Sequence, residues 1–305
     1  MPLSVRGRIR LLTALFAGVI ATGCQPEPGA LAPLRIAFVP QVDMEERHAS
    51  AYQALHTYLS GRLDQPVEII ALENANAALE GMRSGKLDVC NFSPWPFLLA
   101  EEKAGLEALL TTRAPDGGPV TYRGILVSRP ALGIASLDDL KAQAPGLVFA
   151  FEEPVSTSGH LVPRTYLHAA GIAPERDFKR VIYGSDGIAN LFAVASGRVD
   201  VAALSDNSYR RALARGRIVE GAVNVVWTSP PVISHVVATR RMLSAATKER
   251  LRALYVGLPT AAPDLWAEVA RQYSTPVGGY AALDDDALAF FRHAIRDVPG
   301  LQLSP

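Results

Sequence analysis

Cysteine is scarce in this chain, and neither sign of charge is in excess. Its 305 residues include two cysteines, and 30 Lys and Arg residues balance 30 Asp and Glu residues. Nucleic-acid binding needs clustered basic residues, so we expect no nucleic-acid partner. The sequence also lacks both common glycine-rich phosphate motifs, G-x-x-x-x-G-K-S/T and G-x-G-x-x-G, so it indicates no nucleotide site of either kind.

Long apolar runs are also missing, and the one apolar run near the amino terminus is short. Leu11–Ile20 follows three arginines and ends shortly before Cys24. A membrane-spanning helix needs about 20 apolar residues, whereas basic residues before a shorter run are typical of a secretory signal. The small residues before Cys24 resemble the bacterial lipobox, which implies lipidation of Cys24 and removal of residues 1–23. A chance cysteine after an ordinary signal is the alternative.

The segment that follows the signal is rich in Pro and Gly, so residues 24–33 are expected to form a tether. Removal of the signal takes three arginines with it and leaves 27 basic against 30 acidic residues, a net charge of −3. Cys90 is then the only other cysteine, and it has no intramolecular partner once Cys24 is lipidated. We expect it to be a small core residue.

The length and pattern of the rest of the chain predict two α/β lobes. About 280 mature residues reach the size at which single cores usually split into two. Short β-branched runs alternate with helical patterns, which argues for parallel sheets with crossover helices. The predicted strands are Leu34–Val39, Val67–Ala71, Leu87–Phe92, Leu106–Thr111, Leu147–Phe151, Arg180–Tyr183, Val199–Leu204 and Val223–Trp227.

After about His235 the pattern changes, and we expect helices in place of strands. The three predicted helical stretches lie near Ala245–Leu258, Ala262–Tyr273 and Asp284–Val298. Two extended segments, Tyr122–Arg129 and Trp227–Val237, flank the middle third of the chain and are expected to be hinge crossings.

The most informative segment, Glu153–Gly159, follows a predicted strand and precedes a helical pattern. It contains three consecutive hydroxyl side chains, Ser156, Thr157 and Ser158. A helix start favours an anion because its backbone N–H groups are unpaired and carry the positive end of the helix dipole. Each hydrogen bond to a charged group is worth about 1.5–3 kcal/mol. The alternative is that Ser156 or Ser158 only caps the helix.

The run EEPVSTSGHLVP resembles the signature of the phosphate, phosphite and phosphonate-binding periplasmic proteins, in which a Ser-Thr-Ser turn holds phosphonate oxygens. The segments LEGMRSGKLDVCNFSP, YRGILV, GSDGIANLFAVASGRVDVAALSD and WTSPPVI resemble the same family, so the resemblance covers about Leu34 to Pro299. It implies a type II periplasmic-binding fold of class α/β, with two lobes, two hinge crossings and a mostly parallel sheet flanked by helices in each lobe. Lobe one would be residues 34–124 plus 230–305, and lobe two residues 125–229.

The resemblance implies further ligand-binding positions, with departures. Asp206 matches an acidic residue that faces a ligand's ammonium group, and a solvent-facing Asp at a strand end is the alternative. Asp186 stands where the family has a phosphonate-contacting His. A dianion about 4 Å from an ionised Asp is repelled by several kcal/mol at an effective dielectric constant of about 20. Asp186 would therefore accept a proton or hydrogen bond from a monoprotonated ligand, bind the cationic part of a zwitterion, or point away.

Three other residues are candidates for the pocket. His235 stands near a position where the family often has Asp and could supply positive charge if protonated, although a lone His is more often a solvated or core residue. Phe92, with Ala75, lies near the places of family tyrosines that this chain lacks. Tyr122 enters the first hinge crossing.

These features predict an extracytoplasmic solute-binding lipoprotein of an ABC importer. It would bind a small oxyanion of the phosphonate, phosphate or phosphite type, with a zwitterionic ligand as one alternative, and deliver it to a membrane permease. We expect a monomer at the periplasmic or cell surface, anchored through Cys24, with no catalytic activity, cofactor or metal. A ligand-binding partner of a membrane sensor is the alternative. A serine hydrolase is remote, because Ser158 and His160 are two residues apart in a predicted helix and do not face each other.

Overall fold

The computed structural model describes residues 32–38, 46–72, 74–271, 273 and 275–301. The predicted signal, Cys24 and most of the predicted tether lie outside the described residues. Pro33–Pro305 forms one compact unit. Within the described ranges, no helix has the length and apolar character that crossing a membrane requires.

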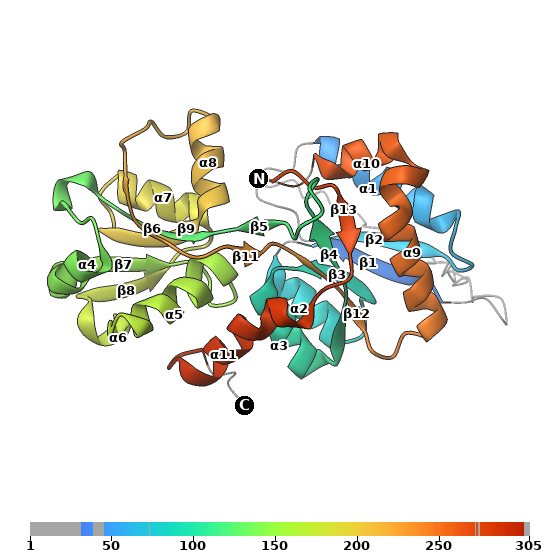
Figure 1. The fold of residues 1–305 in the computed structure, drawn as a ribbon, viewed down its shortest axis with the longest axis horizontal. Helices are drawn as coiled ribbons and strands as arrows, with labels where there is room; N and C mark the ends of the chain where they lie inside the picture. The colour runs from blue at the N-terminus through green and yellow to red at the C-terminus, as the bar shows by residue number, and fades with distance from the viewer. Residues whose placement is uncertain (1–31, 39–45, 73, 272, 274, 302–305) are drawn as a thin grey trace, which may run out of the picture. The chain divides into compact units, whose positions relative to one another are not determined.

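Strands and helices alternate along most of the described chain (Figure 1). The strands are β1 Leu34–Phe38, β2 Val67–Ala71, β3 Val89–Phe92, β4 Leu106–Arg113, β5 Thr121–Tyr122, β6 Gly124–Ser128, β7 Val148–Phe151, β8 Arg180–Tyr183, β9 Val201–Ser205, β10 Asn224–Thr228, β11 Val232–Ile233, β12 Val236–Arg240 and β13 Gly279–Ala281. The helices are α1 Glu46–Ser60, α2 Ala75–Arg83, α3 Pro94–Ala104, α4 Leu137–Gln143, α5 Val162–Ala169, α6 Pro174–Asp177, α7 Gly187–Ala195, α8 Asp206–Ala214, α9 Ala245–Ala261, α10 Pro263–Ala270 and α11 Ala289–Asp297.

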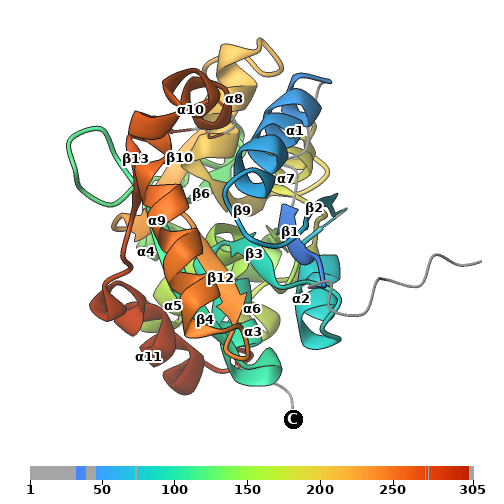
Figure 2. The same cartoon turned by 90° about the vertical axis from the view of Figure 1, so that its right-hand side faces the viewer.

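The first sheet has six strands in the order β13-β4-β12-β3-β1-β2. Strands β1, β2 and β3 pair in parallel, whereas β12 is inserted antiparallel between β3 and β4. Because side chains alternate along a strand, Ile36 packs into one core and Ala37 into another on the opposite face. Figure 2 shows α9 and α1 on one side of this sheet, and α2 and α3 contribute to the core on the other side.

The second sheet has five strands in the order β10-β6-β9-β7-β8. Strands β7, β8 and β9 pair in parallel, and β6 runs against β9 and β10. One face packs on α4 and α5 through Leu140 and Leu167, and the other on α7 and α8 through Leu191 and Ala212. In both sheets, the strand that enters from the other sheet, β12 or β6, pairs antiparallel with its neighbours.

Two short strands connect the sheets. β5 leads from the first sheet into β6, β11 leads back into β12, and the two pair antiparallel through Val232 with Tyr122 and Ile233 with Thr121 (Figure 1). The predicted crossing segments therefore lie side by side.

The expectation that strands stop near His235 was wrong. β12 follows at once, and β13 pairs antiparallel with β4 between α10 and α11. Three helical stretches do follow, but the third begins with a short 3-10 turn at Asp285–Leu288 before α11. A three-residue edge strand such as β13 carries too little alternation to stand out from its neighbours in the sequence.

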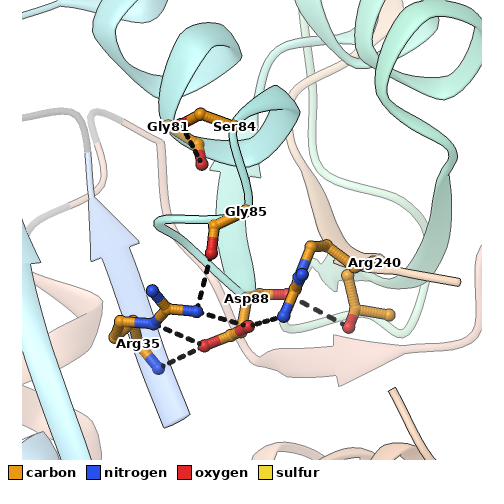
Figure 3. Close-up of polar contacts among 7 residues, drawn as sticks. Arg35, Gly81, Ser84, Gly85, Asp88 and Arg240 are labelled. Carbon is orange, nitrogen blue, oxygen red and sulfur yellow. Dashed lines mark hydrogen bonds and ion pairs between the residues drawn. The ribbon is translucent and has the colours of Figure 1, made fainter. Parts of the chain in front are cut away.

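A buried ion cluster holds the amino-terminal end of β3. Asp88 is 4% exposed at its side chain and lies between the guanidinium groups of Arg35 on β1 and Arg240 on β12 (Figure 3). The Arg35 Nε atom donates to Asp88 at 3.0 Å, and its Nη2 atom donates to the Gly85 carbonyl at 2.8 Å. Burial alone would raise the pKa of Asp88, but hydrogen bonds from Arg35 and Arg240 hold it below its usual range. The cluster fixes three neighbouring strands at the end away from Phe92.

Candidate ligand-binding pocket

A cavity of about 360 Å³ lies between the two sheets. It is lined by residues of both, including Phe38 and Phe92 at the carboxyl ends of β1 and β3. Open α/β sheets bind ligands at this edge. The predicted residues among its lining are Ser156, Thr157, Ser158, Asp186, His235, Phe92, Tyr122 and Ala75.

Several helices begin at this cavity. Ala75 begins α2, Ser93 precedes α3, Gly187 begins α7 and Ser205 caps α8, and all four line the cavity. The hydroxyl turn adds another helix start. Because each helix start is the positive end of a dipole, the backbone here favours an anion.

Ser156 lies at the cavity, but its hydroxyl already has two partners. It accepts the Gly159 backbone N–H at 3.1 Å and donates to Glu152 Oε2 at 2.7 Å. A hydroxyl has one proton to give, so in this state Ser156 has no second donor for a ligand. The capping alternative is what the structure shows for this residue. A one-turn π-helix, Thr157–Leu161, follows before α5.

Thr157 and Ser158 form the centre of a buried hydroxyl cluster. Both side chains lie close to the phenol of Tyr122, which is in β5, and their hydroxyls act to lower the pKa of that phenol. Thr157 Oγ1 also donates to Ser93 Oγ at 3.1 Å and accepts the backbone N–H of Trp95 at 2.9 Å. Burial raises the pKa of Tyr122 far above its usual range, so the phenol keeps its proton. The Ser158 and Tyr122 hydroxyls give the pocket neutral hydrogen-bond donors, whereas the Thr157 proton is engaged by Ser93.

The start of α3 and the hydroxyl turn are held together by Trp95. Its indole N–H donates to the Pro154 carbonyl at 2.8 Å, next to the bond between its backbone N–H and Thr157. An element beside the first sheet thereby contacts the turn of the second sheet. Trp95 itself is 4% exposed and belongs to the core.

Asp186 lines the pocket as the cap of α7. Its Oδ1 accepts the backbone N–H groups of Ile188 at 2.8 Å and Ala189 at 2.9 Å, and Ser185 donates to its Oδ2. These bonds satisfy the helix start and stabilise the carboxylate. The sequence left three roles open for Asp186. In this structure its carboxylate is hydrogen-bonded to the backbone of α7 and needs no ligand as a partner.

Asp206 is the exception among the predicted residues, because it does not line the cavity, although Ser205 and Asn207 do. Its Oδ1 accepts the backbone N–H of Arg123 at 3.0 Å, and its Oδ2 pairs with Arg210 at 3.2 Å. As the first residue of α8, it turns toward its own helix and the crossing strand. In this structure the carboxylate ties the residue between β5 and β6 to α8.

His235 lies in the pocket wall between β11 and β12. Its Nδ1 is 2.7 Å from Ser234 Oγ, its carbonyl accepts a hydrogen bond from Thr111, and its ring meets Tyr273 edge-on at 5.3 Å. Burial lowers the pKa of His235 to about 4, so the imidazole is neutral near pH 7. The expected positive charge is therefore absent in this state, and a neutral ring can still donate one hydrogen bond.

The sequence did not point to several other lining residues. Arg211, on α8, supplies a cationic side chain to the pocket, and Glu152 supplies a second carboxyl beside that of Asp186. Tyr273 and Tyr280 provide pocket tyrosines from the carboxyl-terminal part of the chain, at other positions than those where Phe92 and Ala75 stand in place of the family's tyrosines. Glu152 is the first residue of the run EEPVSTSGHLVP. No local motif marks Arg211, Tyr273 or Tyr280, because each reaches the pocket only through the tertiary fold.

Ser158 and His160 do not form a nucleophile and base. His160 Nδ1 is 2.9 Å from the Pro154 carbonyl, and its Nε2 accepts from Arg164 Nε at 3.0 Å. Both ring nitrogens are thus engaged away from Ser158. Burial lowers the pKa of His160 to about 4.

Known proteins share this sequence and fold. A family model described as the periplasmic substrate-binding protein of phosphonate ABC transporters matches residues 36–288. The phosphonates-binding periplasmic protein of Escherichia coli is 30% identical over 173 residues, which make up 57% of this chain and 51% of that protein. The match thus spans about half of that relative.

Solved structures agree on the fold. The binding component of a phosphonate ABC transporter from Pseudomonas aeruginosa has a TM-score of 0.69 at 26% identity, covering 86% of this chain and 85% of its own. A Prochlorococcus marinus protein solved with methylphosphonate has a TM-score of 0.70 at 19% identity, covering 86% of this chain and 97% of its own. The two-lobed α/β architecture is therefore that of periplasmic binding proteins. With the family model matching most of its length, the chain belongs to the periplasmic substrate-binding proteins of phosphonate ABC transporters.

Proposed function

We propose that this protein is the extracytoplasmic solute-binding component of an ABC importer and binds a phosphonate or related phosphorus oxyanion. The observation that carries the proposal is the convergence of helix starts and buried hydroxyls on one cavity. The Ser158 and Tyr122 hydroxyls would donate to the oxyanion, with Thr157 holding the turn against Ser93 and Trp95, and Arg211 would supply the opposing charge.

The cavity favours a substituted oxyanion over a bare inorganic one. Its volume of about 360 Å³ falls within the range of small-molecule sites, and a water molecule takes up about 30 Å³ of liquid. Tyr273, Tyr280 and Val269 line it together with the polar groups. An organic substituent would pack against this wall while the oxyanion meets the hydroxyl turn.

The mechanism follows from the position of the pocket. We propose that residues 34–124 plus 230–305 form one lobe and residues 125–229 the other, in agreement with the strands that make up each sheet. A ligand that contacts both lobes binds the closed arrangement better than an open one and therefore shifts the population toward it. The closed form would dock on a membrane permease.

The cellular setting is part of the proposal. A lipid on Cys24 would keep the protein at the periplasmic or cell-surface face of a membrane, since two or more acyl chains anchor stably. We infer a monomer without catalytic activity, cofactor or metal. A Cys24→Ser protein that remained membrane-bound would contradict the lipid anchor.

Calorimetry tests the proposed ligand class. Methylphosphonate, aminoethylphosphonate, phosphate, phosphite and sulfate are titrated into wild type, Ser158→Ala and a control, Ser196→Ala. The exposed Ser196 hydroxyl donates to Ala193 and accepts from Arg198, and Ser196 does not line the pocket. We expect phosphonate binding to weaken about 10-fold or more in Ser158→Ala, because one hydrogen bond to a charged group is lost. The control should match wild type. Absence of binding by every phosphorus oxyanion would refute the proposal.

A further inference from the structure

A carboxyl group lies against the oxyanion turn, where a bare anion would be repelled. Glu152 follows β7, lines the pocket and accepts the Ser156 hydroxyl at 2.7 Å. Two glycines make room for it. A Cβ on Gly159 would lie 2.2 Å from the Glu152 Cδ atom, and a Cβ on Gly187 would lie 2.6 Å from its Oε1 atom. The backbone on both sides is therefore fitted to this side chain.

The charges around Glu152 favour its protonated form. Asp186 at the start of α7 and Glu153, the residue after Glu152, are both acidic. Arg211 on α8 opposes them with one positive charge. Burial is the largest influence on the pKa of Glu152 and raises it, as do Asp186 and Glu153. The hydrogen bond from Ser156 and the charge of Arg211 lower it, and the net effect raises the pKa from 4.5 to about 7. The carboxyl thus gains or loses its proton near neutrality, at the place where the ligand would bring negative charge.

We propose that Glu152 is a ligand-binding residue that makes the pocket take its oxyanion together with one proton, which a hydrogen bond between the carboxyl and a ligand oxygen then holds. This inference rests on the proposed function. The proton comes from the solvent, from Glu152 or from the ligand, and the bound complex is the same in each case. No covalent bond forms or breaks apart from the transfer of this proton.

The chemistry of phosphorus oxyanions suits such a site. A phosphate monoester loses its second proton at about pH 6, so this class exchanges a proton close to neutral pH. A protonated carboxyl donates a hydrogen bond where an ionised one only repels. The pocket would therefore accept an anion and proton as a pair and disfavour a bare dianion beside an ionised carboxylate.

Proton-linked calorimetry tests the inference. Methylphosphonate is titrated at several pH values above the Glu152 pKa of about 7, in buffers with different heats of ionisation. For wild type we expect uptake of about one proton and an affinity that falls about tenfold per pH unit at alkaline pH. Glu152→Gln keeps the shape and is always neutral, so its alkaline affinity should be nearly independent of pH.

Glu153→Gln is the matched control, because it removes the same charge one residue along and Glu153 does not line the pocket. At alkaline pH, its affinity for methylphosphonate should fall with pH at the same slope as in wild type. The fall should begin at a slightly lower pH, because Glu153 raises the Glu152 pKa. If affinity falls with pH at the same slope in wild type and in Glu152→Gln, this inference is overturned and the proposed function is not. If Glu152→Gln fails to fold, zero proton uptake by wild type overturns it. If wild type binds no phosphorus oxyanion at any pH, the proposed function fails, and this inference with it.

Discussion

The Tyr122 hydroxyl lies beside the two hydroxyls of the oxyanion turn and lines the pocket with them. Tyr122→Phe removes this hydroxyl as a donor to the ligand and leaves the ring in place. We expect methylphosphonate affinity to fall by about 5–30-fold, which corresponds to about 1–2 kcal/mol, the range for a hydrogen bond near a charge. Calorimetry gives the affinity directly.

Tyr166→Phe is the control for this substitution. Tyr166 stacks on Trp227 and Phe290 and does not line the pocket. Its affinity should equal that of wild type. An equal loss in both variants would show that Tyr122 acts through general stability and not through the turn.

Asp88 has a structural role at the opposite end of the first sheet. Asp88→Asn leaves Arg35 and Arg240 without their buried carboxylate, so we expect a loss of about 3 kcal/mol in the free energy of unfolding. Urea denaturation measures this loss. Glu80→Gln breaks an ion pair that is more than half exposed at both partners and should leave the urea midpoint nearly unchanged.

The sequence predicted local motifs of the site and missed its distant members. Ser156–Ser158 are adjacent and precede a helix, so their joint location at the pocket could be read directly. Arg211 and Tyr273 reach the same cavity from α8 and from beyond α10. Their positions depend on how β12 and α8 are placed by long-range pairing, which no spacing in the sequence encodes.

At the scale of elements, a hydrogen bond spans the pocket between α8 and the segment before β13. Thr275 Oγ1 donates to Asn207 Oδ1 at 3.3 Å, and Asn207 lines the pocket. Thr275→Val removes this bond, so we expect closure to be less favourable and methylphosphonate to dissociate about 2–10-fold faster, from the usual worth of a neutral hydrogen bond. Stopped-flow or surface-plasmon kinetics measure the rate.

Thr57→Val is a suitable control, because the exposed Thr57 hydroxyl bonds only to its own helix at Gln53. Its dissociation rate should not change. A rate in Thr275→Val equal to wild type would contradict a role for this contact in closure.

Elements with strong periodicity were predictable, and short strands that pair over long range were not. All eight predicted strands occur, and α2 begins after the predicted cap Asn74. β12 enters between β3 and β4, more than 100 residues away along the chain, as the register Ala238 to Cys90 shows. Such an insertion depends on the return crossing at β11 and cannot be inferred from a local apolar pattern.

At the scale of the whole molecule, two buried histidines make stability depend on pH. Burial lowers the pKa of both His160 and His235 from 6.5 to about 4, so unfolding takes up protons between these values. Their contribution is present above pH 6.5 and is lost as pH falls toward 4. Glu152 acts in the opposite direction to the two histidines, because its raised pKa adds to the free energy of unfolding at low pH.

We expect a net loss of about 3 kcal/mol in the free energy of unfolding as the pH is lowered across this range, from about 1.4 kcal/mol per pKa unit. Urea denaturation at a series of pH values measures it. His235→Gln removes one of the two histidine contributions, so the Glu152 contribution should offset the remaining one and most of the net loss should disappear. His293→Gln, which changes an exposed residue, should leave the net loss unchanged. An unchanged slope in His235→Gln would contradict the assignment.

The two-lobed fold places the carboxyl ends of strands from both sheets around one cavity, and this arrangement connects the fold to the proposed transport function. A crystal structure with methylphosphonate tests that connection most directly. We predict phosphonate oxygens within hydrogen-bonding distance of the Ser158 and Tyr122 hydroxyls, with the Arg211 guanidinium facing them and Glu152 against one oxygen. A ligand bound elsewhere, or one that leaves the hydroxyl turn uncontacted, would contradict the account.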